Sequence, residues 1–364
     1  MDHRLPAGTV DLDDLDEIQR VDRSRFLLAV ERISEHILDA CARASAVEAL
    51  PAAEGLRSMA ILGMGGSALA GDVCRALLAD SPLFIRTVRG YACPPWVGAD
   101  TLVFAVSHSG DTDETLHAMT TALARGARVI AVSRGGACAA LARERGLPLV
   151  EIPRGFRAST AVAYLIVPLL VLCERLGLCS LGPAVVETVQ MLRDRLAELG
   201  ASSPVARNSA KQLASRLLDR LPVVYGSEGL SSVAAYRWKC QFNETAKVPA
   251  FSHVFPELTH NEVEGWGAWR EITPNAETLI LRDPSEHPHL RRKVDAAISL
   301  LSTSGHAVHE IHPRGSSPLA RLFDLISFGD FVSTYLALLR GEDPMPVDVV
   351  KSFKRVVADS GVAS

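Results

Sequence analysis

The sequence predicts an α/β protein of two domains, each built on a doubly wound parallel sheet flanked by helices. In the first half, short apolar runs alternate with segments of helical period, the pattern of a parallel sheet with crossover helices. A strand, a glycine turn and a helix follow one another at 60–66 and again at 222–229. A length of 364 residues suits two domains of ordinary size. We therefore expect an internal duplication.

The first element is a charged segment at 12–47 with apolar residues at helical spacing. We expect one or two helices there, packed on the outside of a sheet. Their apolar stripe comprises Leu15, Ile18, Phe26, Leu27, Val30, Ile33, Ile37 and Leu38. Strands are then predicted at 59–62, 83–88, 102–106, 129–132 and 149–152, and helices at 67–79, 112–125 and 136–145.

An apolar helix at 159–176, expected in an interface, and a helical segment at 182–218 lead to the second half. A small, polar stretch at 201–204 that ends in proline indicates the domain boundary. The predicted domains are residues 1–200, with the leading helices, and residues 201–364, with the closing helices. Later strands are predicted at 277–281 and 308–311, and helices at 287–302, 317–340 and 346–357.

Composition narrows the classes of function. A net charge of −4 and a pI near 6.3 do not indicate binding to nucleic acid or to an anionic membrane surface. The longest apolar run, 161–173, is shorter than the about 20 residues that span a bilayer. The segment 1–10 has no signal-peptide core, and seven cysteines without a Cys-x-x-Cys pair indicate reduced thiols. We expect a cytoplasmic protein.

A glycine loop follows the first predicted strand. Gly63, Gly65 and Gly66 break the apolar run, and Ser67 is expected to cap the next helix. Backbone N–H groups at such a helix N-terminus, together with the helix dipole, favour a bound phosphate. The alternative is a glycine turn that only packs the helix on the strand.

A hydroxyl-rich loop follows the third predicted strand. It reads Ser107-His-Ser109-Gly110-Asp-Thr112. Because ligands of an open parallel sheet sit beyond the carboxyl ends of its strands, we expect this loop and the glycine loop to share one phosphate. The alternative is that Thr112, with Thr115, only caps the following helix.

These two loops, Gly-Met-Gly-Gly-Ser and Ser-x-Ser-Gly-x-Thr-x-Glu-Thr, resemble a SIS (sugar isomerase) domain. Segments 238–251, 256–266, 329–337 and 343–347 are similar to the bifunctional phosphoglucose/phosphomannose isomerases, and the resemblance extends over about 50–357. It implies two SIS-like domains, a homodimer, and metal-independent and cofactor-free interconversion of glucose 6-phosphate and/or mannose 6-phosphate with fructose 6-phosphate.

The resemblance also implies roles for single residues. Glu244 is expected to be the base that moves the proton between C2 and C1, and His260 to open the sugar ring and to complete the partner subunit's site. Lys354 is expected to assist ring opening, with Lys351, one helical turn away, as the alternative. The phosphate is expected to be held by Gly65, Gly66, Ser67, Ser107, Ser109 and Thr112. Without the resemblance, Glu244 could equally be a surface glutamate, His260 a turn histidine and Lys354 a solvated lysine.

The sequence departs from the family after the fifth strand. The family has Pro-x-Gly-x-x-Pro-Arg there, and its arginine supports the charge of the enediolate; Ser159 stands at that position here. We expect Arg157, or otherwise Arg154, to bring a guanidinium to the same space, since losing this electrostatic support lowers the rate strongly. Asp111 and Thr259 replace two asparagines that are common in the family.

Three other readings are open. Gly63-x-Gly65-x-x-Ala68 fits a dinucleotide-binding fingerprint, but the second strand ends in arginines rather than the acidic residue that binds ribose. The second alternative is a sugar-phosphate sensor that binds the ligand without catalysis, which Ser159 at the family's arginine position favours. The third is a metal site, for which His306, His309 and His312 lie close in sequence; a strand would place 309 on the opposite face, so we expect strand-end histidines.

Overall fold

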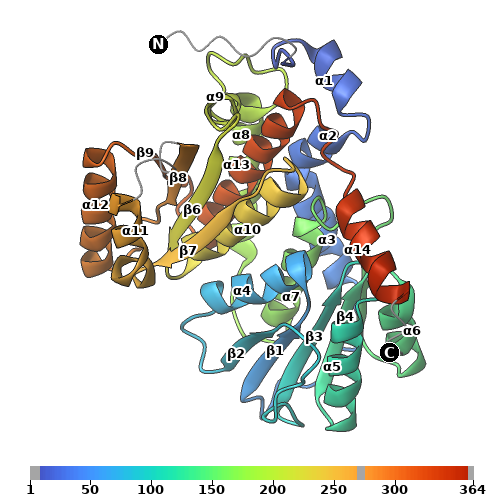
Figure 1. Cartoon of the computed structure of the whole chain (residues 1–364). Coiled ribbons are helices and arrows are strands. Elements are labelled where there is room, and N and C mark those ends of the chain that lie inside the picture. The colour runs from blue at the N-terminus through green and yellow to red at the C-terminus, as the bar shows by residue number, and fades with distance from the viewer. Residues whose placement is uncertain (1–8, 269–274, 360–364) are drawn as a thin grey trace.

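A computed structural model describes residues 9–268 and 275–359, so most of the leader prediction for 1–10 lies outside the described residues. The chain forms two sheets with helices on both faces (Figure 1). The first has the strand order β2-β1-β3-β4-β5 and the second the order β7-β6-β8-β9. Every pairing is parallel, which confirms the predicted α/β fold class.

The first sheet matches the predicted strands to within one or two residues. Its strands are β1 (Ser58–Leu62), β2 (Phe84–Val88), β3 (Thr101–Ser107), β4 (Arg128–Ser133) and β5 (Leu149–Glu151). β1 and β3 are buried along their whole length, because alternate residues of each point into two different cores. One core contains α3 (Ile33–Ser45), α4 (Gly65–Leu77) and α7 (Val162–Arg175), and the other contains α5 (Asp113–Ala124) and α6 (Gly136–Glu144).

The second sheet contains one strand that the sequence pattern did not predict. Its strands are β6 (Leu221–Ser227), β7 (Phe251–Phe255), β8 (Ala276–Leu281) and β9 (Ala307–Ile311). β7 is an edge strand of mostly half-exposed residues, so polar side chains interrupt its apolar pattern. Helices α10 (Leu230–Glu244) and α13 (Pro318–Leu339) cover one face, and α12 (Pro288–Thr303) covers the other. The short η1 (Glu257–His260) and α11 (Glu262–Ala268) follow β7.

The leading segment forms three helices instead of one or two. They are α1 (Leu15–Val21), α2 (Phe26–Glu31) and α3. Asp22 is the C-cap of α1, and its carboxylate accepts hydrogen bonds from the N–H groups of Phe26 and Leu27, the first two residues of α2, at 2.7 and 2.9 Å. Two members of the predicted stripe are wrong: Leu15 and Leu38 are 44% and 45% exposed.

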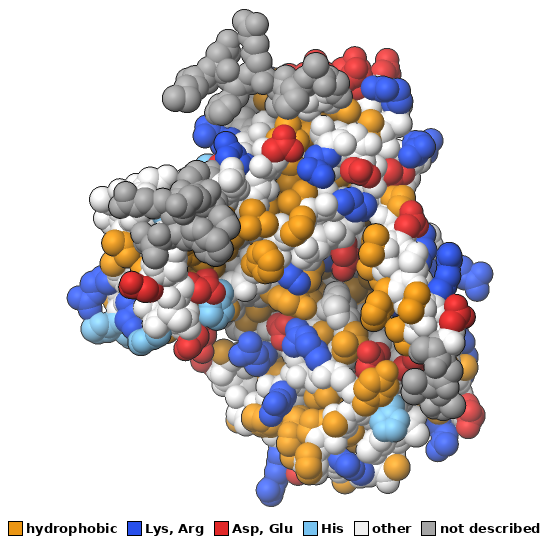
Figure 2. Space-filling model, viewed as in Figure 1, with side chains coloured by type: hydrophobic (Ala, Val, Ile, Leu, Met, Phe, Trp, Pro, Cys, Tyr) orange, Lys and Arg blue, Asp and Glu red, His pale blue; other side chains and the backbone are white. Residues whose placement is uncertain are grey.

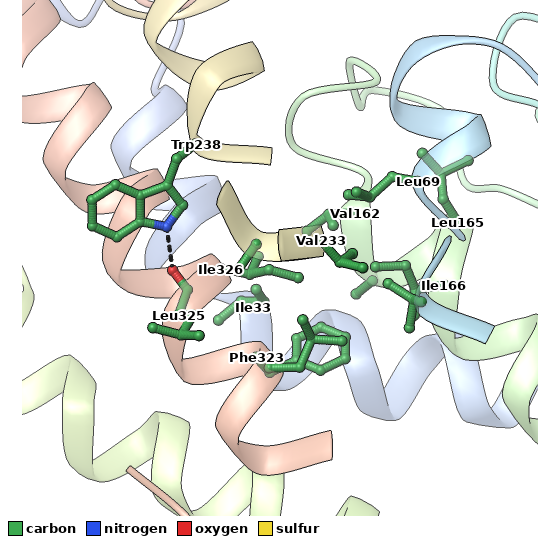
Figure 3. Close-up of a cluster of buried hydrophobic side chains, with 14 of the residues drawn as sticks. Ile33, Leu69, Val162, Leu165, Ile166, Val233, Trp238, Phe323, Leu325 and Ile326 are labelled. Atoms are coloured by element: carbon green, nitrogen blue, oxygen red, sulfur yellow. Dashed lines mark hydrogen bonds between the residues drawn. The ribbon is translucent and has the colours of Figure 1, made fainter. Parts of the chain in front are cut away.

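α13 is the central helix of the molecule. It is long and apolar enough to cross a membrane by composition, yet every residue from Leu319 to Leu339 is buried inside the protein. α8 (Gly182–Leu199), α9 (Ser209–Arg216) and α10 pack around it. Gly329 leaves room for the ring of Trp238, whose Nε1 donates to the carbonyl of Leu325 at 2.7 Å (Figure 3). A single apolar core therefore extends from β1 to α13.

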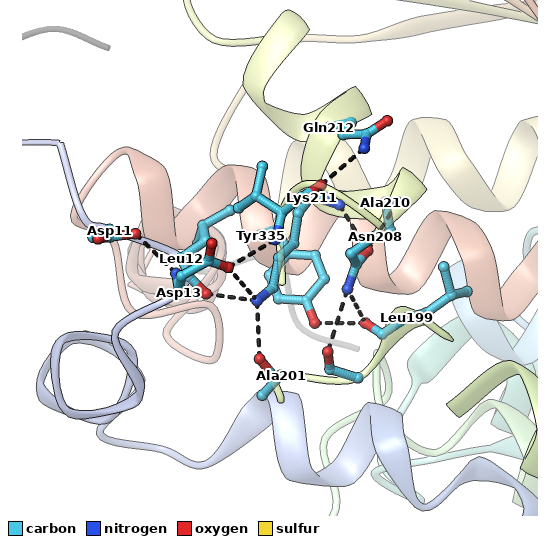
Figure 4. A network of polar contacts seen from close by, with 12 residues as sticks. Asp11, Leu12, Asp13, Leu199, Ala201, Asn208, Ala210, Lys211, Gln212 and Tyr335 are labelled. Atoms are coloured by element: carbon cyan, nitrogen blue, oxygen red, sulfur yellow. Dashed lines mark hydrogen bonds and ion pairs between the residues drawn. The ribbon is translucent and has the colours of Figure 1, made fainter. Parts of the chain in front are cut away.

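A buried polar network surrounds the predicted domain boundary (Figure 4). Lys211 is fully buried, and its ammonium donates to the carbonyls of Leu12 and Ala201 at 2.6 and 2.9 Å. Asn208 and Tyr335 both donate to the carbonyl of Leu199, at 2.9 and 2.6 Å. The loop between α8 and α9 is therefore anchored to the first residues of the described chain and to α13.

Candidate active site

The two predicted phosphate loops lie side by side because their strands are neighbours. β1 pairs in parallel with β3, so the loops that follow them leave the same edge of the sheet. The N–H of His108 donates to Ser67 Oγ at 3.3 Å. Ser67 therefore joins the two loops, and its predicted role as helix cap is wrong, because α4 already begins at Gly65.

Glycines allow the sharp turn from β1 into α4. A Cβ at Gly63 would lie 3.1 Å from both Ala68 N and Val106 O, tighter than ordinary side-chain contacts. Gly65 has a φ of +51°, in the left-handed region. Gly65 is exposed and Gly66 half-buried, so the N-terminus of α4 lies at the surface. A helix N-terminus of this kind favours an anion.

The hydroxyl-rich loop is held by its own side chains. Ser107 Oγ and Thr112 Oγ1 are 3.0 Å apart, and the N–H of Gly110 donates to Ser107 Oγ at 3.1 Å. Thr112 stands at the N-cap of α5, but its hydroxyl pairs with Ser107 rather than with the helix backbone. Ser109 Oγ accepts from the N–H of Asp111 at 3.2 Å. The loop therefore gathers three hydroxyls at the start of a second helix.

Positive charge lies around this loop. His108 is 8% exposed, and burial, together with the nearby charges of Arg134 and Arg157, lowers its pKa from 6.5 to about 4. His108 is therefore neutral near pH 7, and the positive charge comes from the two exposed arginines. A phosphate dianion at the loops would be attracted by both guanidinium groups.

Glu244 lies on the wall of a pocket between the two halves of the chain. It is the last residue of α10, and it is exposed. The pocket is lined by Gly65, Gly66, Leu69, Ala158, Ser159, Tyr236, Arg237, Cys240, Gln241 and Glu244. The α10 residues recur every three or four positions and so share one helix face. The structure thus brings Glu244 to the N-terminus of α4 and to Ser159.

Arg237 is a pocket residue that the sequence reasoning missed. It is 3% exposed and binds Asp330 with two hydrogen bonds of 3.1 and 2.9 Å. Its Nη2 also donates to the carbonyl of Ser159 at 2.5 Å. The spacing of seven residues between Arg237 and Glu244 on a predicted helix was the available signal. Arg157, by contrast, is exposed and is not among the residues that line this pocket.

The other two catalytic candidates lie outside the pocket lining. His260 is exposed at the end of η1, and Lys354 is exposed on α14 (Asp348–Asp359). Lys351 pairs with Asp348 at 2.8 Å on the same helix. Lys247 links this region to the pocket, because its ammonium donates to the carbonyls of Glu244 and Pro344 at 2.5 and 3.0 Å. The segment before α14 is therefore tied to the end of α10.

The second copy of the glycine loop holds a carboxylate of the chain itself. Ser227, at the end of β6, donates to Glu286 at 2.9 Å, and the N–H of Asp283 donates to the same oxygen at 3.2 Å. Arg282 pairs with the other oxygen of Glu286 at 3.2 Å. Ser227 of the second loop is therefore already bonded to a carboxylate of the chain, which makes the first loop the better candidate anion site.

The three histidines of the metal hypothesis point to separate partners. His306 contacts the carbonyl of Trp266 at 2.8 Å, and His309 contacts Glu277 at 2.7 Å. His312 lies 3.7 Å from Glu310. Within 9–268 and 275–359, no group of three or more His, Cys, Asp or Glu side chains has the arrangement of a metal site.

Known proteins are similar to this chain over most of its length. Residues 206–357 match the family described as bacterial phospho-glucose isomerase C-terminal SIS domain. A bifunctional phosphoglucose/phosphomannose isomerase from Caldicellulosiruptor bescii is 37% identical over 311 residues, covering 84% of this chain and 91% of that protein. Another, from Thermoplasma acidophilum, is 34% identical over 302 residues, covering 83% and 90%. The crystal structure of a hypothetical protein from Thermus thermophilus shares the fold, with a TM-score of 0.74 at 16% identity over 96% of this chain and 94% of that one.

Proposed function

Because the chain belongs to the bifunctional phosphoglucose/phosphomannose isomerase family, we propose that it interconverts glucose 6-phosphate, mannose 6-phosphate or both with fructose 6-phosphate. One observation carries the proposal: the carboxylate of Glu244 shares a pocket with Gly65 and Gly66, which adjoin the hydroxyl-rich loop. A base and an anion cradle at the two ends of one site are what a sugar-phosphate isomerase needs.

In this proposal the phosphate is bound first and sets the position of the sugar. The N–H groups that begin α4 and the hydroxyls of Ser67, Ser107, Ser109 and Thr112 surround it. Glu244 then takes the proton from C2 and returns it to C1. The carbon-bound proton is carried by Glu244 in this proposal, so the proposed mechanism uses neither a metal nor an organic cofactor.

Ring opening is assigned to His260 of a second subunit, with Lys354 assisting. The exposed position of His260 supports a role in a neighbouring copy's pocket. An apolar stripe on α14 supports a homodimer as well: Val349, Phe353 and Val356 are 85%, 68% and 67% exposed. Such a stripe on one helix favours burial against another chain. On the face shown in Figure 2, acidic and basic side chains are interspersed, so a partner there would meet mixed charge.

A coupled assay tests the proposed function. Purified protein is given glucose 6-phosphate or mannose 6-phosphate, and the formation of fructose 6-phosphate is followed. Turnover with at least one aldose phosphate is expected. Its absence with both substrates, in a protein that still shows a melting shift with them, would support the second candidate, a binding protein without chemistry, which Ser159 at the family's arginine position favours.

The oxidoreductase hypothesis gains no support from the site. Asp72, an acidic side chain that contacts β2, already accepts from Thr87 at 2.9 Å and pairs with Arg89. A ribose hydroxyl would have to compete with both partners. Absorbance at the nicotinamide band, measured with NAD or NADP and a hexose phosphate, is expected to stay constant.

A further inference from the structure

Gln241 carries a buried amide that the chain itself satisfies only in part. The residue is 1% exposed, and its Nε2 makes no hydrogen bond of good geometry with the described residues. Burial raises the pKa of Asp330, and the charge of Arg237 and weak hydrogen bonding from the Gln241 amide oppose that rise. Because an amide nitrogen has two N–H donors, one remains for a ligand even if the other faces Asp330. A buried donor left unused destabilises a fold, so its presence in a pocket points to a ligand that completes it.

Arg237 holds a second unused donor beside this amide. Its Nε and Nη2 are occupied by Asp330 and by the carbonyl of Ser159, whereas Nη1 makes none of the hydrogen bonds found in the described part of the chain. Asp330 and Ser159 together fix the guanidinium in one orientation. A donor that is already oriented loses little entropy when a ligand binds to it.

Both donors lie on the same helix face as the proposed base. Arg237, Gln241 and Glu244 are separated by four and three residues on α10, and all three line the pocket. Ser159, which also lines the pocket, has no charge to offer to an oxyanion. Arg237 of α10 is the cation that lines this pocket in its place.

We propose that Gln241 Nε2 and Arg237 Nη1 donate hydrogen bonds to the oxyanion of the enediolate, an inference that rests on the proposed isomerase function. When Glu244 removes the proton from C2, the C–H electron pair forms the C1–C2 double bond. The π electrons of the C1 carbonyl then move to O1, which becomes the anion. A proton moves from O2 to O1, and Glu244 returns its own proton to C1, which leaves the ketone at C2.

Gln241 is expected to contribute much of the stabilisation of the oxyanion, because the charge on Arg237 is largely compensated. Asp330 offsets much of the charge on Arg237, so the guanidinium acts as an oriented donor more than as a free cation. Donors aimed at a developing oxyanion act mainly in the transition state. Gln241→Leu should therefore lower kcat by about a hundred- to a thousandfold while KM changes less than twofold.

Binding of two inhibitors tests the same step without turnover. The first is a five-carbon phosphorylated hydroxamate, planar and anionic like the enediolate; the second is glucitol 6-phosphate, which has the phosphate and hydroxyls but no planar oxyanion. Calorimetry on the full chain should show that Gln241→Leu weakens the hydroxamate at least tenfold and glucitol 6-phosphate less than twofold. Gln212→Leu, which removes an exposed amide on α9, is the matched control and should change neither.

A structural role would give a different pattern. If Gln241 only supported the pocket, Gln241→Leu would lower the unfolding temperature and weaken both inhibitors alike, and the proposal would be wrong. Equal affinity of wild type and variant for the hydroxamate would also overturn it. Gln241→Leu could also weaken the hydroxamate selectively in a protein that shows no isomerase turnover. That result would support Gln241 as an oxyanion donor and reject the proposed function. Failure of the wild type to bind either inhibitor would reject both.

Discussion

Arg237 on α10 donates a hydrogen bond to the backbone carbonyl of Ser159 at 2.5 Å. This bond joins the helix of the proposed base to the segment where the family carries an arginine. Asp330 on the central helix α13 holds the same guanidinium, so three distant parts of the chain meet at one side chain. The position of the pocket therefore depends on packing between the two halves.

Glu244→Gln should remove turnover and leave substrate binding nearly intact. The amide keeps the shape of the carboxylate but cannot accept the proton from C2, and losing an acid–base group costs about 10²- to 10⁴-fold in rate. The measurement is kcat in the coupled assay beside calorimetric binding of glucitol 6-phosphate. Turnover like that of wild type would remove Glu244 from the mechanism.

Arg157→Ala separates two roles for Arg157. The structure places its charge near His108 and Asp348 and leaves it out of the pocket lining. We therefore expect KM to rise about three- to tenfold with kcat unchanged, since an exposed charge contributes about 1 kcal/mol to holding the phosphate. A fall in kcat at saturating substrate would instead restore the sequence-based hypothesis that Arg157 supports the enediolate. The same measurement on Arg154→Ala tests the alternative arginine.

His108 should make the stability of the protein depend on pH. Its pKa is about 4 in the folded chain and 6.5 in the unfolded chain, so between these values the unfolded state binds more protons. The contribution of neutral His108 to the free energy of unfolding is complete above pH 6.5. As the pH falls to 4, it decreases by on the order of 3 kcal/mol. His108→Gln should lose less stability than wild type between pH 7 and 4.5 in urea unfolding. The exposed His117→Gln is the control; equal pH dependence of wild type and His108→Gln would contradict the expectation.

Lys211→Met should lower the free energy of unfolding by on the order of 2–4 kcal/mol. The change removes a fully buried ammonium and leaves the carbonyls of Leu12 and Ala201 without their donor. Thermal unfolding measures the effect. Lys351→Met, which breaks an exposed pair on α14, should change stability by less than about 1 kcal/mol. Equal stability of the two variants would show that the network in Figure 4 contributes little.

The sequence predicted the parts of the fold that depend on local pattern. Buried apolar runs between glycines identified the strands of the first sheet to within one or two residues. β7 was missed because its exposed edge removes the apolar pattern. The contacts of Lys211 with Leu12 and of Arg237 with Asp330 join residues 199 and 93 positions apart, and nothing local in the sequence pairs them. For the same reason, the role of Glu244 was predicted from a family motif, whereas that of Gln241 was inferred only from the structure, through its incompletely used amide.

The exposed position of His260 leads to the last prediction. In one chain His260 is not among the residues that line the pocket of Glu244, although ring opening requires an acid–base group at the bound sugar. A two-fold dimer in which each subunit lends its His260 to the other resolves this separation. His260→Ala and Glu244→Gln chains, each inactive alone, should then recover about a quarter of wild-type activity when mixed, because half of the random dimers are mixed and each has one complete site. Subunit exchange is checked with two differently tagged chains. Exchange without recovery would show that each chain supplies its own ring-opening group, and it would direct the search to Lys354 on α14.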